Sequence, residues 1–213
     1  MRDLLLGLLE FREQSLSHYA DHFRRLGEGQ RPQALFIACA DSRVVPSLLT
    51  SAEPGDLFTM RNVGNLVPPA RADGTSSGDL SEASAIEYAV AVLKVPNVVV
   101  CGHSNCGAMR AIVTGSMVDD APNLGKWLDH ARPALAMASR QPDFAGGRAL
   151  QDRVSQANVL VQLEHLCTYP SVRKGLKDKT LAVAGWWFDI TTGDMLVNHQ
   201  VNGIFCALGP AVD

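Results

Sequence analysis

Two short segments of the chain contain residue types that can bind a transition metal. They are Cys39-Ala40-Asp41-Ser42-Arg43 and His103-Ser104-Asn105-Cys106-Gly107. Each follows an apolar run that predicts a buried strand, so both lie where a strand opens into a loop. Two thiols and one imidazole form a ligand set that suits zinc, with a fourth position left open. A metal site with an open position usually catalyses a reaction.

Taken singly, these residues have simpler interpretations, because a buried cysteine is usually a small hydrophobic residue. The prediction depends on their combination. Cys106 follows His103 by three residues, and Cys39 precedes His103 by 64 residues, which fits a site assembled at the carboxyl ends of parallel strands. The other cysteines, Cys101, Cys167 and Cys206, are expected to be packing residues. Of these, Cys101 is expected to lie inside its strand.

Asp41 and Arg43 follow the first cysteine closely. On an exposed surface such an ion pair contributes little, but in a partly buried site an arginine holds a carboxylate with two parallel hydrogen bonds. Two states of Asp41 are compatible with the sequence. Asp41 either takes the fourth zinc position, or it is held by Arg43 and leaves that position to water. A helix that begins near Cys106 and Gly107 offers free backbone N–H groups, which suit a small anion.

The composition indicates a globular protein. The chain has 213 residues, of which 46% are hydrophobic and 19% charged, and its formal net charge is −3. This charge, without a basic run, argues against nucleic-acid binding. No apolar run approaches the roughly 20 residues that span a bilayer, so we expect no membrane association. The 5 cysteines are odd in number and fit reduced thiols in the cytoplasm better than a disulfide framework.

Apolar periodicity predicts an α/β fold with a mostly parallel central sheet flanked by helices. We expect a single domain over 1–213, with an N-terminal helical arm at 1–29 and an α/β core at 30–213. The arm packs either on a partner subunit or on its own core. Helices are expected at 4–26, 81–94 (capped by Ser81), 105–113, 123–139 (bent at Pro133) and 152–168. Strands are expected at 34–38, 56–60, 98–101, 181–190 and 195–199, the last two as an antiparallel hairpin.

The motifs resemble those of the β-class carbonic anhydrases. The patterns Cys-x-Asp-Ser-Arg and His-x-x-Cys-Gly match in full at 39–43 and 103–107. The resemblance extends in order and approximate spacing from the arm to about Val201, and it is greatest for the bacterial cyanate-operon and plant-type branch. Four further segments take part: Glu53-Pro54-Gly55-Asp56, Arg61-Asn62-Val63-Gly64-Asn65, Ser84-Ala85-Ile86-Glu87-Tyr88 and Gly185-Trp186-Trp187-Phe188-Asp189.

This resemblance implies an enzyme that hydrates CO₂ reversibly to bicarbonate and a proton by means of zinc-bound hydroxide. It implies one Zn²⁺ per subunit, with Cys39, His103 and Cys106 as ligands. Asp41 and Arg43 would be the catalytic pair, and Asp41 would become a fourth ligand only in a closed state.

The resemblance also implies a substrate pocket and an oligomer. The apolar, CO₂-sized part of the pocket would be formed by three side chains, and bicarbonate would be contacted by one glutamine and one backbone N–H. These residues are Phe58, Val63, Tyr88, Gln30 and Gly107. Because Tyr88 would come from the neighbouring subunit, the sites would lie at the interface of a homodimer or of a higher homo-oligomer.

Two departures from the family pattern stand out. A second branch has a tryptophan and a tyrosine that, with an arginine, form a non-catalytic bicarbonate site favouring the closed state. Here those positions are Phe36 and Phe188, and only Arg61 remains. We therefore expect this regulatory site to be missing and Asp41 to pair with Arg43 near neutral pH. The loop 71–79 is also longer than is usual in this branch.

Three other functions are compatible with parts of this pattern. A hydrolase of CS₂ or COS on the same zinc site would differ mainly in access to its pocket. A metal-free enzyme would use Cys39 or Cys106 as a nucleophile activated by His103. A structural zinc module would need four permanent ligands, and Asp41 is the candidate for the fourth.

Overall fold

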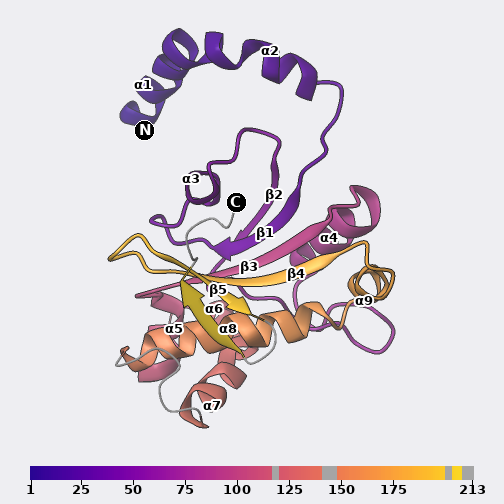
Figure 1. The fold of residues 1–213 in the computed structure, drawn as a ribbon. Coiled ribbons are helices and arrows are strands. Elements are labelled where there is room, and N and C mark those ends of the chain that lie inside the picture. Colours follow the sequence, from indigo (N-terminus) through magenta and orange to yellow (C-terminus); the bar gives the residue numbers. More distant parts are fainter. Residues whose placement is uncertain (117–119, 141–147, 200–202, 208–213) are drawn as a thin grey trace.

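The computed structural model contains a six-stranded sheet with the strand order β2-β1-β3-β4-β5-β6. It describes residues 1–116, 120–140, 148–199 and 203–207. The first four strands in this order run parallel, and β5 and β6 continue the sheet antiparallel at one edge (Figure 1). The predicted α/β fold with its late antiparallel hairpin is therefore confirmed. The strands are β1 (Ala34–Cys39), β2 (Leu57–Asn62), β3 (Asn97–His103), β4 (Ala182–Phe188), β5 (Met195–His199) and β6 (Ile204–Ala207).

The carboxyl ends of the two central strands form the edge that holds the metal-binding segments. β1 ends at Cys39 and β3 ends at His103. The strands are parallel neighbours, and Ala38 pairs with Cys101 in their register. All six residues of β1 are buried, as expected for a parallel strand covered on both faces. Consequently, residues 64 positions apart in the sequence leave the sheet at the same place.

One face of the sheet is covered by helices from distant parts of the chain. The helices of the core are α3 (Pro46–Thr50), α4 (Leu80–Glu87), η2 (Tyr88–Val92), α5 (Gly107–Thr114), α6 (Pro122–Leu128), η3 (Asp129–Ala131), α7 (Arg132–Arg140), α8 (Leu150–Leu166) and α9 (Pro170–Lys177). α8 packs on β3 and β4, and α5 and α7 pack on α8 (Figure 1). Leu35 and Ile37 of β1 share a buried cluster with Ile86 of α4 and Val159 of α8. On the opposite face Phe36 packs in a smaller cluster.

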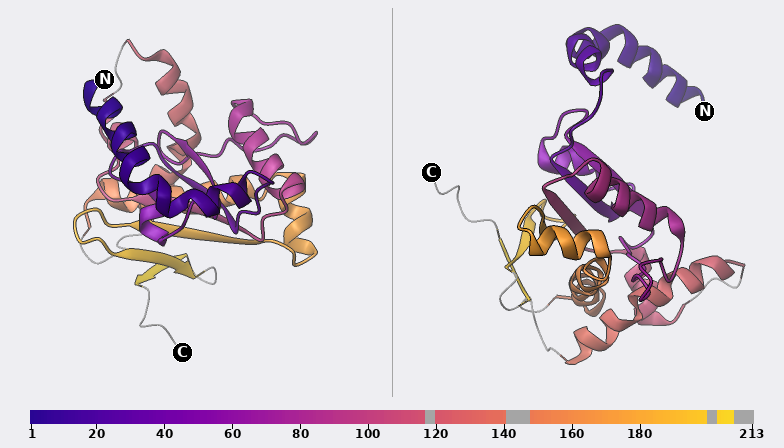
Figure 2. Two further views of the ribbon diagram at one scale, coloured as in Figure 1. Left: turned by 90° about the horizontal axis from the view of Figure 1, so that it is seen from above. Right: turned by 90° about the vertical axis from the view of Figure 1, so that its right-hand side faces the viewer.

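The N-terminal arm consists of α1 (Arg2–Glu10), a π-helical turn η1 (Phe11–Ser15) and α2 (Leu16–Leu26). None of these helices contains a buried residue. The arm stands away from the sheet, as Figure 1 and the right-hand view of Figure 2 show. Packing of the arm on its own core, one of the two sequence-based alternatives, is therefore wrong. Its exposed large apolar side chains are Leu4, Leu5, Leu6, Leu8, Leu9, Phe11, Leu16 and Phe23.

The arm is attached at its carboxyl end. His22 Nε2 donates to the carbonyl oxygen of Pro54 at 2.6 Å. Gly55 lies so close to Leu26 that an added Cβ would stand 2.6 Å from Leu26 Cδ2. These contacts join the end of α2 to the turn that precedes β2.

Several local predictions need correction. The helix expected at 123–139 is divided by the 3₁₀ turn η3, which precedes Pro133. The N-cap of α4 is Asp79, whose carboxylate accepts from the Ser81 N–H at 2.6 Å, so the cap lies two residues before the predicted one. The sequence did not predict α3, α9 or β6, because they are short, with 5, 8 and 4 residues, and short segments give ambiguous patterns.

Among the residues that the structure describes, no helix is both long enough and apolar enough to cross a membrane. The end of the predicted core at 208–213 lies outside the described residues.

Candidate metal centre

Three side chains from different elements converge at the edge of the sheet. The ligand atoms of Cys39, His103 and Cys106 all lie within 4.8 Å of one another, and the three residues are buried. Cys39 ends β1, His103 ends β3, and Cys106 is the residue immediately before α5. In the described ranges this is the one cluster of three or more such side chains close enough to hold an ion.

The hydrogen bonds of His103 leave one ring nitrogen free to bind a metal. Its Nδ1 lies 2.8 Å from the carbonyl oxygen of Ser104, and a carbonyl only accepts, so Nδ1 carries the proton. Nε2 is then an unprotonated acceptor, and it is buried without a hydrogen-bond partner among the described residues. The imidazole is fully buried. A buried polar atom without a partner is costly unless a ligand satisfies it, so the site fits a metal ion.

The two thiols near His103 differ in their readiness to ionise. A hydrogen bond with Cys106 lowers the pKa of Cys39 against the opposing effect of burial. The same hydrogen bond, together with burial, raises the pKa of Cys106. We assign the first proton lost to Cys39, because the Gly64 N–H also donates to its sulfur at 3.4 Å. Metal ligation requires thiolates, and one of them is thus already favoured.

Asp41 is held by Arg43 in a two-point hydrogen-bonded pair. Arg43 Nε donates to Oδ1 at 2.9 Å, and its Nη2 donates to Oδ2 at 2.7 Å. The Arg43 backbone N–H donates to Oδ1 at 3.0 Å. The hydrogen bonds from Arg43 hold the pKa of Asp41 well below its usual range, so the carboxylate is charged. Oδ2 also lies 3.9 Å from Nε2 of His103, which places the pair at the rim of the metal centre.

The end of β2 and the turn after it support the first metal-binding segment. Arg61 donates from Nε to the carbonyl of Cys39 at 3.1 Å and from Nη2 to the carbonyl of Asp41 at 2.7 Å. Gly64, three residues later, directs its N–H at the sulfur of Cys39. The Ala40 N–H donates to the carbonyl of Asn62 at 2.8 Å. The backbone around the first ligand is therefore fixed from the neighbouring strand.

α8 carries buried polar side chains that form hydrogen bonds with the backbone of the loops around the metal centre. Ser155 Oγ donates to the carbonyl of His103 at 2.8 Å and accepts from Trp187 Nε1 at 3.1 Å. Asn158 Nδ2 donates to the carbonyl of Gly64 at 3.0 Å. Gln162 Nε2 donates to Asn158 Oδ1 at 2.9 Å. The helix thus contacts both loops through hydrogen bonds as well as through its apolar side chains.

An ion pair braces the segment after His103. Arg148 Nη1 donates to Asp189 Oδ2 at 2.6 Å, and its guanidinium lies 4.6 Å from the ring centroid of Trp187. Ser104 Oγ donates to Asp189 Oδ1 at 3.3 Å. Burial by itself raises the pKa of Asp189, but the hydrogen bonds from Arg148, Thr191 and Ser104 and the charge of Arg148 together outweigh it, so the pKa lies below its ordinary value.

The predicted substrate-pocket residues fall into two groups. Val63 is 43% exposed in the turn that also holds Gly64, and Gly107 is the first residue of α5, directly after Cys106. Phe58 and Tyr88 instead stack on each other with ring centroids 5.8 Å apart, and Tyr88 is 45% exposed.

The second group lies far from the ligands of its own chain. In the register of β1 and β2, Phe58 pairs with Leu35, four residues before Cys39. At about 3.3 Å per residue, this separation is about 13 Å along the strands. Gln30 is exposed in the segment between α2 and β1. The structure of one chain therefore brings together seven of the ten predicted residues around the metal centre and keeps Gln30, Phe58 and Tyr88 apart from them.

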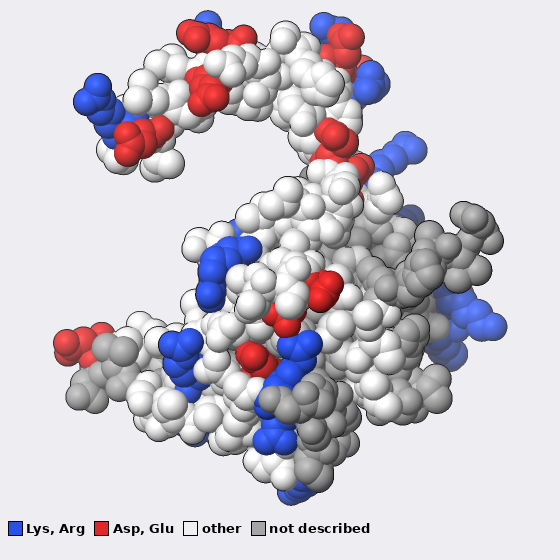
Figure 3. Space-filling view, turned by 60° about the vertical axis from the view of Figure 1, so that its left-hand side comes forward, with Lys and Arg blue, Asp and Glu red and all other residues white. Residues whose placement is uncertain are grey.

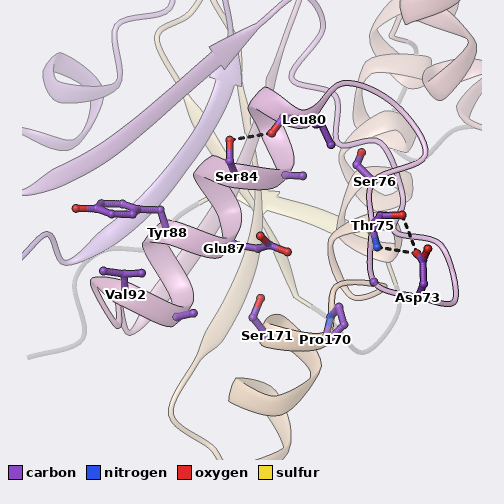
Figure 4. Close-up of a pocket in the computed structure, with 13 residues that line it drawn as sticks. Asp73, Thr75, Ser76, Leu80, Ser84, Glu87, Tyr88, Val92, Pro170 and Ser171 are labelled. Carbon is purple, nitrogen blue, oxygen red and sulfur yellow. Dashed lines mark hydrogen bonds between the residues drawn. The ribbon is translucent and has the colours of Figure 1, made fainter.

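Two cavities lie near these residues. One of about 870 Å³ is formed by the loop 73–76, the segment from α4 to η2, and the start of α9, with Leu80, Glu87 and Pro170 in its wall. Figure 4 shows the ring of Tyr88 extending away from this cavity. The long loop predicted at 71–79 thus forms a wall of this cavity. A second cavity of about 710 Å³ adjoins the metal-binding segment and includes Ala40 in its lining.

The remaining cysteines lie outside the centre. Cys101 is fully buried in the cluster of Phe36, on the face of the sheet opposite to α8. Burial raises its pKa to about 12. Cys167 is partly buried. Cys206 is exposed, so the packing role predicted for it is wrong. It lies on the edge strand β6, where Phe205 takes the inward position and the next residue points outward.

Several supporting residues carried no signal in the sequence. Trp127 lies on the short helix α6. The three polar residues of α8, namely Ser155, Asn158 and Gln162, have the side chains that are usually interpreted as a solvated helix face. Gly64 carried a detectable signal, since it belongs to the segment 61–65 of the family pattern. Its φ of +86° is a conformation that glycine adopts without strain.

Comparison with known proteins agrees with this geometry. A family model described as carbonic anhydrase matches residues 34–195. A carbonic anhydrase of Pseudomonas aeruginosa is 45% identical over 193 residues, covering 91% of this chain and 85% of that protein. One of Synechocystis is 38% identical and covers 97% of this chain and 74% of that protein.

Solved structures show the same likeness. The β-carbonic anhydrase CcaA has a TM-score of 0.89 at 36% identity, covering all of this chain and 94% of the other. A β-carbonic anhydrase of Sordaria macrospora, described as tetrameric, has a TM-score of 0.79 at 27% identity, with 98% of each chain covered. The chain belongs to the carbonic anhydrase family and, within it, to the β class. It catalyses the reversible hydration of CO₂ to bicarbonate and a proton.

Proposed function

We propose that each subunit of this carbonic anhydrase binds one zinc ion through Cys39, His103 and Cys106. The observation that carries this proposal is the unpartnered, buried Nε2 of His103 beside two cysteine sulfurs, all within 4.8 Å. A sulfur-rich set with one nitrogen favours zinc over the harder divalent cations. Zinc at such a site acts as a Lewis acid and lowers the pKa of water from about 15.7 towards about 7.

Asp41 then serves as a hydrogen-bond acceptor beside the open position. Arg43 donates two hydrogen bonds to Oδ1 and one to Oδ2, so a lone pair of Oδ2 stays free to orient a reacting water. Because the carboxylate is turned towards Arg43, it does not complete a four-ligand set. This arrangement favours a catalytic site over a structural zinc module, which would need a permanent fourth ligand.

The residues at the positions of the family's regulatory bicarbonate site do not favour the closed state, in which Asp41 would bind the metal. Phe36 packs edge-to-face on Trp186 with ring centroids 5.7 Å apart, and Phe188 belongs to the same apolar cluster. Nε and Nη2 of Arg61 donate to backbone carbonyls. The side chains of Phe36 and Phe188 offer bicarbonate no hydrogen-bond donor, so we propose that Asp41 stays paired with Arg43 at neutral pH, as in the plant-type branch.

CO₂ binds in a pocket shared between two subunits. Val63 and the Gly107 N–H come from the chain that supplies the zinc ligands. Phe58, Tyr88 and Gln30 come from its partner, because within one chain they lie too far from the centre. We therefore propose that a homodimer is the smallest complete unit. The Sordaria macrospora relative, which is described as tetrameric, supports self-association.

The arm supplies the surface for this association. Its exposed leucines and phenylalanines would be costly to leave in water. Figure 3 shows charged side chains on the outer side of the arm and a largely uncharged concave side. We propose that residues 1–29 embrace the partner and that 30–213 form the catalytic core of one domain. The cytoplasm is the proposed location, since all 5 cysteines are free, and neither nucleic acid nor a membrane is a proposed partner.

The test is stopped-flow CO₂ hydration together with metal analysis, on the wild type and on Cys106→Ser. We expect one zinc per wild-type chain and, in the variant, loss of both zinc and activity. A zinc-loaded wild type without activity would refute the proposal. Full activity in a zinc-free preparation would instead favour a cysteine nucleophile. Rapid turnover of CS₂ or COS in place of CO₂ would identify the hydrolase alternative.

A further inference from the structure

One peptide group beside the metal centre is held at both of its polar atoms. The N–H of Gly64 donates to Cys39 Sγ at 3.4 Å. The carbonyl of the same peptide unit belongs to Val63, and it accepts from Trp127 Nε1 at 2.7 Å. In a planar trans peptide the C=O and the N–H point in opposite directions. The hydrogen bond from Trp127 therefore fixes the direction in which the N–H points towards Cys39.

The same hydrogen bond strengthens the N–H as a donor. A carbonyl that accepts a hydrogen bond polarises its peptide group, so the opposite N–H becomes more positive. Cys39 is 5% exposed, so little water competes for its sulfur. In such an environment the charge on a thiolate depends strongly on the few donors around it. Trp127 thus influences this sulfur through one intervening peptide.

The position of Gly64 is fixed further by its neighbours. Its φ of +86° favours glycine, and an added Cβ would lie 3.1 Å from Ala108 Cβ and 3.3 Å from Met109 Cε. Its own carbonyl accepts from Asn158 Nδ2 at 3.0 Å. The Oδ1 of Asn158 accepts from Gln162, which orients the amide. The peptide beside Cys39 is accordingly clamped by Trp127 from α6 on one side and by Asn158 from α8 on the other.

Trp127 is itself held in place. Its ring packs edge-to-face with His130 at a centroid distance of 5.8 Å. The next residue, Leu128, is 2% exposed and anchors α6 in the core. The indole N–H is therefore presented to Val63 by a helix with a fixed position.

We propose that Trp127 is a positioning residue of the metal centre, acting through the Val63–Gly64 peptide on the charge that Cys39 presents to the metal. The inference rests on the proposed metal binding. Its consequence is a sulfur that donates less charge, which leaves the bound metal a stronger Lewis acid. Asn158 assists by holding the following peptide.

The test uses the full-length protein with Co²⁺ in place of zinc, because thiolate–cobalt charge transfer is visible in the absorption spectrum. Trp127→Phe keeps an aromatic ring but removes the indole N–H. We expect the charge-transfer band to move to longer wavelength, since the sulfur carries more negative charge. In the zinc form we expect kcat to fall about tenfold.

A matched control is Trp186→Phe. Trp186 packs on Phe36 at 5.7 Å, and its indole has no hydrogen-bond partner among the described residues. We expect the band of this variant to stay at the wild-type position. A second variant, Asn158→Asp, keeps the shape of the side chain but cannot donate to the carbonyl of Gly64. Its band should move in the same direction as that of Trp127→Phe.

The outcomes separate this inference from the proposed metal site. A wild-type protein without a thiolate–cobalt band would refute the metal centre and this inference with it. A normal wild-type band that Trp127→Phe leaves unmoved would refute the positioning role alone. An equal shift in Trp186→Phe would also refute it. If Trp127→Phe failed to bind cobalt, the band of Asn158→Asp would decide, and an unmoved band would overturn the inference.

Discussion

At the scale of single residues, the centre keeps two neighbouring anions in different roles. Cys39 and Asp41 are two positions apart, yet the thiol faces Cys106 and His103 while the carboxylate faces Arg43. The two-point pairing with a guanidinium keeps Asp41 charged and oriented. A carboxylate free to rotate would compete with water for the metal. In the proposed metal site, the guanidinium would therefore decide which of these anions binds the ion.

The first prediction concerns this carboxylate. In Asp41→Asn the amide offers one oxygen in place of two, so Arg43 loses half of its pairing. We expect kcat/KM for CO₂ hydration to fall about 100-fold, with one zinc per chain retained. Stopped-flow rates and metal analysis check both parts. Asp178→Asn, which removes the exposed pairing with Lys174, is the control and should match the wild type. Wild-type rates in Asp41→Asn would contradict the prediction.

At the scale of elements, the sequence predicted the strands well, and the three side chains of its predicted ligand set lie together, but it missed the residues that support them. β1 and β3 are continuous apolar runs, and such runs identify buried strands directly. α8 presents the opposite case. Its buried residues include Ser155, Asn158 and Gln162, whose polarity is that of a solvent-facing surface. Their partners are backbone atoms of distant loops, which local periodicity does not reveal.

A close approach between β3 and α8 yields a second prediction. An added Cβ at Gly102 would stand 2.7 Å from Val159 Cγ2 and 3.2 Å from the carbonyl oxygen of Ser155. Gly102→Ala should therefore lower the free energy of unfolding by about 1–3 kcal/mol. Gly107→Ala is the matched control, because nothing lies within 4 Å of its added Cβ. Urea denaturation measures both, and equal stability of the two variants would count against the packing argument.

The third prediction concerns the pair of Arg148 and Asp189, which joins the segment before α8 to the residue after β4. The pKa of Asp189 is lower in the folded protein than in the unfolded chain. The ion pair therefore stabilises the fold fully at pH values above the pKa that Asp189 has in the unfolded chain. This stabilisation is lost as the pH falls through the pKa that Asp189 has in the folded protein. At neutral pH, Asp189→Asn should cost about 3 kcal/mol, because Arg148 is left without its partner.

The pH dependence distinguishes this charge effect from lost packing. The difference in unfolding free energy between the wild type and Asp189→Asn should be constant above about pH 5 and shrink below it. Urea denaturation at a series of pH values, with excess zinc present, provides the measurement. Asp178→Asn again serves as the control. A difference that stays unchanged down to about pH 3 would show that the charge of Asp189 is not responsible.

At the scale of the whole molecule, the chain is a catalytic core with an unpartnered arm. The arm joins the core near Pro54 and Gly55, and large apolar side chains are exposed along its length. The sequence predicted a helical arm but could not decide what covers it. The choice between a partner subunit and the chain's own core depends on where the arm lies relative to the core, and local sequence patterns do not contain this information.

The fourth prediction tests the arm. Removal of residues 1–28 should leave a monomer that keeps its zinc but loses about 100-fold in kcat/KM, because Phe58 and Tyr88 no longer reach a partner's centre. Sedimentation velocity and stopped-flow rates measure the two effects. Leu8→Glu should have the same effect by placing a charge on the apolar surface, whereas Glu13→Gln should remain wild-type. A truncated protein that is dimeric and fully active would contradict the proposed arrangement.

The hydrogen bonds beneath the metal centre also have a consequence for the order of folding. Gly64 is joined to Asn158 across 94 residues, Val63 to Trp127 across 64, and the first ligand is 64 positions from the second. Contacts between such distant residues form late, because each requires the closure of a long loop. Nascent or unfolded chains would therefore have no assembled set of three ligands. We expect metal uptake to follow collapse of the sheet, so that the metal stabilises a finished core.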